Sequence, residues 1–117
     1  MIAHKRLLGK RGEIWAKKYF EDKGYQILNT NWRYKHLEVD IISHKNDVLH
    51  FIEVKTRVGQ NVIPEDSVDA KKIIHLIDAA EEYMIQHPIW QKLQIDVLSI
   101  TVFENKKSFF LIEDIYI

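Results

Sequence analysis

The sequence predicts an α/β fold in which a mixed sheet of four to five strands is flanked by helices, in the order α-β-β-β-α-β-β. Two segments place apolar residues at helical spacings, and five segments show the character of strands. Two of those strands face each other across a short polar turn, as in a hairpin. A length of 117 residues suits one compact domain, so we expect residues 1–117 to form a single unit.

The first helix is expected over residues 4–23, where apolar residues recur every three or four positions. Gly24 is a natural end for this helix. Residues 25–33 are then expected to form a strand. The apolar face of the helix consists of Leu7, Leu8, Ile14, Ala16, Tyr19 and Phe20.

A hairpin is expected over residues 38–57, with its turn at Asn46 and Asp47, because polar residues of this kind tolerate turn dihedrals. This turn pairs residues whose numbers add up to 93. One face of the resulting register is apolar and is expected to lie in the core. The pairs on that face are Val39 with Val54 and Ile41 with Ile52.

The other face of the hairpin is expected to bring two carboxylates together. The same register places Asp40 opposite Glu53 and Glu38 opposite Lys55. Directly opposed residues have Cβ atoms roughly 4.5–5.5 Å apart. Two carboxylates at that separation repel each other unless a cation or a proton is shared between them.

The second half of the chain completes the α/β pattern. Residues 58–64 are expected to form a loop, and a helix begins near Asp66 or Ser67, either of which can cap it, and ends before Pro88. Strands are expected over residues 93–103 and 108–112. The buried side of the helix is expected to consist of Val68, Ile73, Ile74, Ile77, Ala80 and Met84.

Composition excludes several classes of protein. The chain has no cysteine, which excludes disulfides and thiolate metal sites, and no apolar run of the roughly 20 residues that a membrane span needs. The polar N-terminus is unlike a signal peptide, so we expect a cytoplasmic protein without a membrane partner. The first 35 residues carry nine basic and three acidic side chains, whereas the rest of the chain carries eight and fourteen. This asymmetry is compatible with a basic surface for phosphates, or with ordinary solvated faces.

The carboxylate pair and the lysine beside it suit phosphodiester hydrolysis. Asp40 and Glu53 can hold Mg²⁺, which prefers oxygen ligands. Lys55, on the same strand face as Glu53, can position the attacking water and stabilise negative charge. The alternative is a surface ladder in which Glu38 and Lys55 form an exposed ion pair, but this leaves the opposition of the two carboxylates unexplained.

Five short motifs stand in order along the chain, at residues 9–13, 24–28, 31–33, 38–42 and 51–57. In this combination they resemble the YraN-like family of predicted endonucleases, and the resemblance continues more weakly through Val68, Lys72, Ala80 and Tyr83 to residues 96–97. It covers nearly the whole chain, and the combination of motifs is more specific than any one of them.

That family is similar to the archaeal Holliday-junction resolvases and to the PD-(D/E)XK nuclease superfamily. The resemblance implies a restriction-endonuclease-like core and Mg²⁺-dependent cleavage, with Mn²⁺ as a substitute cation. It implies that Asp40, Glu53 and Lys55 are the catalytic motif and that Glu13 is a further catalytic and metal-binding acid. Without the resemblance, Glu13 would be interpreted as a solvated residue paired with Lys17.

The predicted substrate is DNA, branched or single-stranded, and a homodimer is expected by analogy because a resolvase-like enzyme must address two strands. The residues expected to contact phosphates are Lys10, Arg11, Arg33 and Arg57. His36, His44 and His50 show no metal-ligand spacing and receive no role.

Two positions depart from the family pattern. Leu37 stands where glycine usually precedes the acids, and Gln94 stands where a basic residue usually precedes Asp96. Both bear on substrate and activity more than on the fold. Two competing functions therefore stay open: a non-catalytic nucleic-acid-binding module of a recombination or repair complex, and an interaction protein with neither activity.

Overall fold

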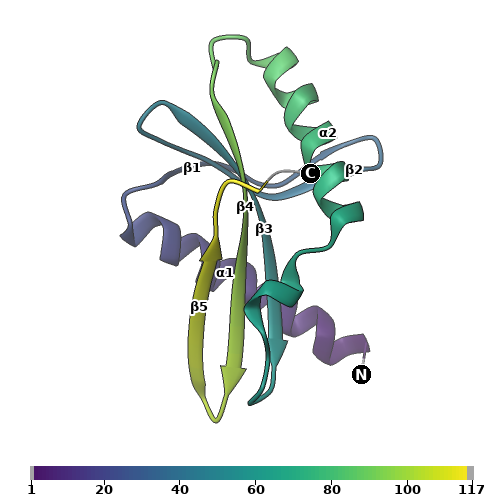
Figure 1. Cartoon of the computed structure of the whole chain (residues 1–117), viewed down its shortest axis with the longest axis vertical. Coiled ribbons are helices and arrows are strands. Elements are labelled where there is room, and N and C mark those ends of the chain that lie inside the picture. Colours follow the sequence, from purple (N-terminus) through teal and green to yellow (C-terminus); the bar gives the residue numbers. More distant parts are fainter. Residues whose placement is uncertain (1, 116–117) are drawn as a thin grey trace.

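The computed structural model describes the backbone of residues 2–115 and the side chains of residues 6–115. Its elements follow the predicted order, with one short 3-10 helix, η1, added before the second α-helix (Figure 1). They are α1 (Ile2–Asp22), β1 (Gln26–Tyr34), β2 (Leu37–Lys45), β3 (Val48–Val58), η1 (Pro64–Ser67), α2 (Ala70–Gln86), β4 (Leu93–Phe103) and β5 (Lys106–Ile112).

The five strands form one mixed sheet in the order β1-β2-β3-β4-β5. Only β3 and β4 run parallel, and α2 provides the crossover between them, whereas the other neighbouring strands are antiparallel. The helices cover opposite faces, with α2 in front of the sheet and α1 behind it (Figure 1). The predicted α/β class, strand number and element order are confirmed.

Each helix packs on its own apolar core. Under α2, the cluster joins Phe51 of β3 and Val97 of β4 to Ile73 and Tyr83 of the helix. Under α1, a second cluster joins Phe20 to Ile52 and other residues of the sheet. Neither described helix combines the length and apolar character that crossing a bilayer requires.

The hairpin turn forms as predicted. Asn46 and Asp47 have φ values of 53° and 65°, which is the left-handed pair of dihedrals that a two-residue hairpin turn needs. The ladder from Lys45–Val48 to Ile41–Ile52 has the predicted register. The turn chemistry therefore set the alignment of β2 and β3 at this end of the hairpin.

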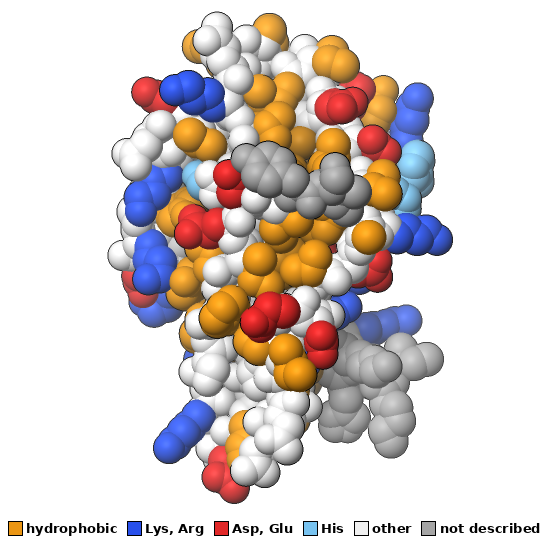
Figure 2. All heavy atoms as spheres, in the orientation of Figure 1, with side chains coloured by type: hydrophobic (Ala, Val, Ile, Leu, Met, Phe, Trp, Pro, Cys, Tyr) orange, Lys and Arg blue, Asp and Glu red, His pale blue; other side chains and the backbone are white. Residues whose placement is uncertain are grey.

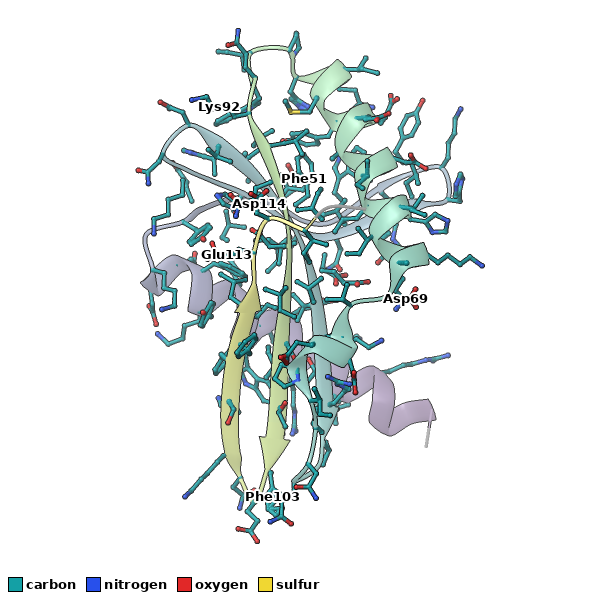
Figure 3. All side chains as sticks on the ribbon, in the orientation of Figure 1. Phe51, Asp69, Lys92, Phe103, Glu113 and Asp114 are labelled. Atoms are coloured by element: carbon teal, nitrogen blue, oxygen red, sulfur yellow. The ribbon has the colours of Figure 1, made fainter. Side chains whose placement is uncertain are left out.

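The start of α2 differs from the prediction. The cap is Asp69, at the N-terminal end of the helix in Figure 3, and not Asp66 or Ser67. Its Oδ1 accepts hydrogen bonds from the backbone nitrogens of Lys71 and Lys72 at 3.0 and 3.5 Å. Residues 64–67 instead form η1, because Val68 adopts an extended conformation that separates the two helices.

The buried face of α2 is also rotated from the predicted one. Ile74 was expected in the core but is 47% exposed, whereas Leu76, Ala79 and Tyr83 are buried. Positions 73, 76, 80 and 83 are spaced by three and four residues, so they form one continuous stripe toward the sheet. A helix with an isoleucine at both 73 and 74 could not bury both equally.

Charges on the face seen in Figure 2 are mixed. Lys and Arg side chains lie toward both margins, Asp and Glu side chains lie among them, and apolar side chains occupy the middle. On this face, the uneven charge of the sequence therefore does not produce one basic and one acidic surface.

Gly12 allows α1 to approach β3 closely. A Cβ atom added at Gly12 would overlap the side chain of Thr56, whereas one added at Gly9 would meet nothing within 4 Å. We expect Gly12→Ala to lower the free energy of unfolding by about 1–3 kcal/mol through overpacking. The matched change Gly9→Ala should raise it by roughly 0.5–1 kcal/mol, because alanine favours the helix.

Urea denaturation of both variants checks this prediction. The free energy of unfolding is expected to fall for Gly12→Ala and to rise for Gly9→Ala, although the two positions are only three residues apart. If Gly12→Ala were as stable as Gly9→Ala, the close contact between α1 and β3 would not exist in solution.

Candidate active site

The candidate site lies where β2 separates from β3. The described ladder between these strands ends at Ile41–Ile52, one pair before the acids. Beyond it, Oδ2 of Asp40 accepts a hydrogen bond of 2.8 Å from the backbone nitrogen of Val54. The side chain of Asp40 thus takes the place of a ladder carbonyl.

This geometry corrects part of the predicted register. Asp40–Glu53 and Glu38–Lys55 are not ladder pairs, and neither is Val39–Val54. The β1–β2 hairpin runs across the long strands β3 to β5 (Figure 1), which carries the start of β2 away from β3. The two catalytic candidates on β3 and the one on β2 therefore meet around an opening in the sheet instead of on a continuous ladder.

That opening forms a pocket of about 370 Å³. It includes three of the predicted catalytic residues, Asp40, Glu53 and Lys55, and adds side chains from the β1–β2 turn and from α2. The complete lining is His36, Glu38, Asp40, Glu53, Val54, Lys55, Lys72, His75 and Leu76.

Glu53 carries a buried carboxylate that is only partly compensated. Its side chain is 18% exposed, and Oε1 lies 3.8 Å from Nζ of Lys72. Oε2 is buried without a hydrogen-bond partner among the described atoms. Burial raises the pKa of Glu53, and the charges of Lys72 and Lys55 oppose that rise.

Asp40 is held in an environment that disfavours its charge. Its pKa is raised to about 6, mainly by burial, and the hydrogen bond from Val54 opposes this rise. The negative charges of Glu53, Glu13 and Glu38 also contribute to the raised pKa. Several carboxylates therefore lie close enough to repel one another, as expected of a site that a cation would neutralise.

Lys55 has a lowered pKa. Burial is the main cause, and the neighbouring charge of Lys72 is the next. The charge of Glu53 acts in the opposite direction. A lysine whose ammonium form is disfavoured is better suited to proton transfer near neutral pH than an exposed lysine.

Glu13 lies near this site but does not line the pocket. Its Oε2 accepts a hydrogen bond of 3.2 Å from Nδ2 of Asn31 on β1. Gly12, the residue before it, brings α1 against β3. Within the described part of the chain, no group of three or more histidine and carboxylate side chains is assembled to hold a metal ion. The metal role of Glu13 beside Asp40 and Glu53 stays a prediction.

The four residues expected to contact phosphates come from three elements, α1, β1 and β3. Lys10 and Arg11 are exposed on α1, whereas Nη2 of Arg33 donates to Oε1 of Glu38 at 3.5 Å. Nη2 of Arg57 donates to the carbonyl of Ile63 and to Oγ of Ser67, each at 2.8 Å. Arg57 thus anchors the segment that leads into α2, and its contact with nucleic acid stays a prediction.

The two departures from the family pattern have structural positions. Leu37 is buried in the core under α2. Gln94 donates through Nε2 to Oδ1 of Asp96 at 2.9 Å, in a cluster with His50 away from the pocket. Neither residue lines the pocket.

The sequence predicted no role in the site for three residues that line the pocket, which are Lys72, His36 and His75. The rings of His36 and His75 lie 6.0 Å apart at the pocket, although they come from the β1–β2 turn and from α2. Lys72 and His75 are three residues apart, which places both on one side of α2. That spacing identifies a shared helix side, but nothing in the sequence relates it to the hairpin.

Comparison with known proteins relates the chain to one family. A model described as "Uncharacterised protein family UPF0102" matches residues 12–100, a range that includes Glu13, Asp40, Glu53, Lys55 and Lys72. A UPF0102 protein of Parabacteroides distasonis is 37% identical over 115 residues, covering 97% of this chain and 93% of that protein. One of Flavobacterium psychrophilum is 38% identical over 103 residues, covering 87% and 85%. One of Fervidobacterium nodosum is 32% identical over 114 residues, covering 86% of each.

Proposed function

This chain belongs to the uncharacterised protein family UPF0102, and we propose that it is a metal-dependent endonuclease that hydrolyses phosphodiester bonds of DNA. One observation carries the proposal: Asp40 and Glu53 bring two largely buried carboxylates to a single pocket, where Oε2 of Glu53 has no hydrogen-bond partner among the described residues. Buried carboxylates are normally paired or bound to a cation, because an uncompensated buried charge is costly.

The donor set fits Mg²⁺, with Mn²⁺ as a substitute. Asp40 and Glu53 would hold the cation through oxygen atoms, and Glu13 would assist them. When bound, the cation would supply positive charge against the scissile phosphate and make water more acidic. The cation would also offset the burial and the repulsion between carboxylates that together raise the pKa of Asp40.

Lys55 would act on the attacking water and on the phosphate of the substrate. Its side chain lies beside Glu53 and lines the same opening, so it can orient the attacking water. It can also stabilise negative charge that develops on the phosphate, because a lysine donor in a partly desolvated site interacts strongly with an anion. Branched or single-stranded DNA is the proposed substrate.

We expect Glu53→Gln to reduce Mn²⁺-dependent cleavage by about 10²-fold or more, because the change removes the charge that would hold the cation. The assay follows nicking of branched, single-stranded and duplex DNA by the whole chain. Glu81→Gln, an exposed position on α2, is the matched control and should leave the rate unchanged.

Two outcomes would contradict the proposal. Tight DNA binding without Mn²⁺-dependent nicking, unchanged in Glu53→Gln, would support a non-catalytic binding module. Failure to bind any nucleic acid at low salt would support an interaction protein.

A further inference from the structure

Lys72 is placed at the pocket by a well-defined turn of helix. The Asp69 cap accepts a hydrogen bond from the backbone nitrogen of Lys72 itself, at 3.5 Å. The Lys72 side chain is 48% exposed, and its Nζ lies 3.8 Å from Oε1 of Glu53. The ammonium group of Lys72 therefore lies next to a buried acid and is still accessible to a ligand in the solvent.

The wall of the pocket that contains Lys72 has two adjacent positive charges. Lys72 and Lys55 both line the pocket, together with Glu53, which lies 3.8 Å from Nζ of Lys72. The single negative charge of Glu53 cannot neutralise both lysines. An anion between the lysines would remove their repulsion, and each ammonium has three donors to offer.

We propose that Lys72 binds, together with Lys55, the phosphate group of the nucleic-acid strand that enters the pocket. This inference rests on the proposed function, because that function supplies nucleic acid as the ligand. His75, three residues further along the same side of α2, lines the pocket beside Lys72 and extends this wall. Lys72 thus becomes a phosphate-binding residue contributed by α2, outside the motif on the hairpin.

The competing explanation is that Lys72 only neutralises Glu53. The two roles predict different dependence of nucleic-acid affinity on substitutions at Lys72 and Glu53. If Lys72 acts through Glu53, removal of the Glu53 charge makes Lys72 dispensable for binding. If Lys72 contacts phosphate, its loss weakens binding by the same factor whether or not Glu53 is charged.

The experiment measures binding of a fluorescein-labelled single-stranded oligonucleotide by anisotropy, with EDTA present so that neither metal nor cleavage contributes. The full chain is compared with Lys72→Gln, Glu53→Gln and the double variant. We expect Lys72→Gln to weaken binding several-fold and to reduce the slope of log affinity against log salt by about 1. The double variant should be weaker than Glu53→Gln by the same factor.

Lys71→Gln is the matched control, because the neighbouring lysine is exposed and does not line the pocket. It should bind as the wild type does, and Lys72→Arg should retain most of the affinity. Equal binding by Glu53→Gln and the double variant, or an equal loss from Lys71→Gln, would overturn this inference alone. Absence of binding by the wild type would overturn both this inference and the proposed function.

Discussion

Replacement of Asp40 by asparagine is expected to abolish metal-dependent cleavage and, in the absence of metal, to stabilise the folded protein at neutral pH. Asparagine keeps an oxygen that can accept the hydrogen bond from the nitrogen of Val54. It removes the charge that burial and the neighbouring acids disfavour. A gain in stability together with a loss of activity is expected where a residue needed for function destabilises the fold.

The pH dependence of this effect has a definite sign. The folded state raises the pKa of Asp40 from its ordinary value of 3.8 to about 6. An acid with a raised pKa binds its proton more tightly in the folded state, so the stability of the fold decreases as pH rises from 3.8 to about 6. The penalty is fully present above that pH, disappears below the unfolded value, and amounts to at most about 3 kcal/mol.

Urea denaturation across this pH range, with and without Mg²⁺ or Mn²⁺, measures the effect. Without metal, the wild type should lose stability relative to Asp40→Asn as pH rises from 3.8 to about 6, and the difference should stay constant above that pH. Added metal should restore the stability of the wild type and leave Asp40→Asn unchanged, because only the carboxylate binds the cation.

Asp40→Ala is the control for the backbone contact. It removes both the charge and the acceptor for Val54, so it should be less stable than Asp40→Asn. If the wild type and Asp40→Asn had identical pH profiles and identical responses to metal, Asp40 would not hold a cation.

Replacement of Asp96 by alanine is expected to destabilise the protein by about 3–5 kcal/mol. Asp96 is fully buried, and its carboxylate accepts three hydrogen bonds. Nδ1 of His50 donates to Oδ2 at 2.8 Å, whereas Nε2 of Gln94 and the backbone nitrogen of Asp114 donate to Oδ1 at 2.9 and 3.0 Å. The last of these bonds holds the segment after β5 across the sheet, where Figure 3 labels Asp114.

Thermal and urea denaturation of Asp96→Ala and Asp96→Asn measure the loss. The asparagine variant keeps one acceptor oxygen, so its loss should be intermediate. Gln94→Ala should cost less than either change, because it removes a single donor. A loss below about 1 kcal/mol for Asp96→Ala would mean that this buried cluster does not hold the C-terminal segment in solution.

Local chemistry made the register of the hairpin predictable. Asn46 and Asp47 favour one turn type, and the turn fixes the alignment of the strands that leave it. The point at which β2 leaves β3 was not predictable in the same way. In the neighbouring part of β1, Asn31 adopts a φ of 51° between the paired residues Thr30 and Trp32, and the hairpin pattern alone does not indicate this conformation.

The contribution of α2 to the pocket was likewise not predictable from the sequence. Asp66, Ser67 and Asp69 are all acceptable caps, and only the tertiary structure selects the last. The packing of α2 on the sheet buries Leu76 and exposes Ile74. The same orientation of the helix places Lys72 at Glu53.

Asp40 also has a structural role that does not depend on catalysis. Its carboxylate accepts a hydrogen bond from the backbone nitrogen of Val54, which lies beyond the end of the described ladder between β2 and β3. We therefore expect that homologues which have lost enzymatic activity would tolerate asparagine, serine or threonine here but not an aliphatic residue. In such homologues, we expect Glu38 and Glu53, the other acids that line the pocket, to be substituted before the residue at position 40.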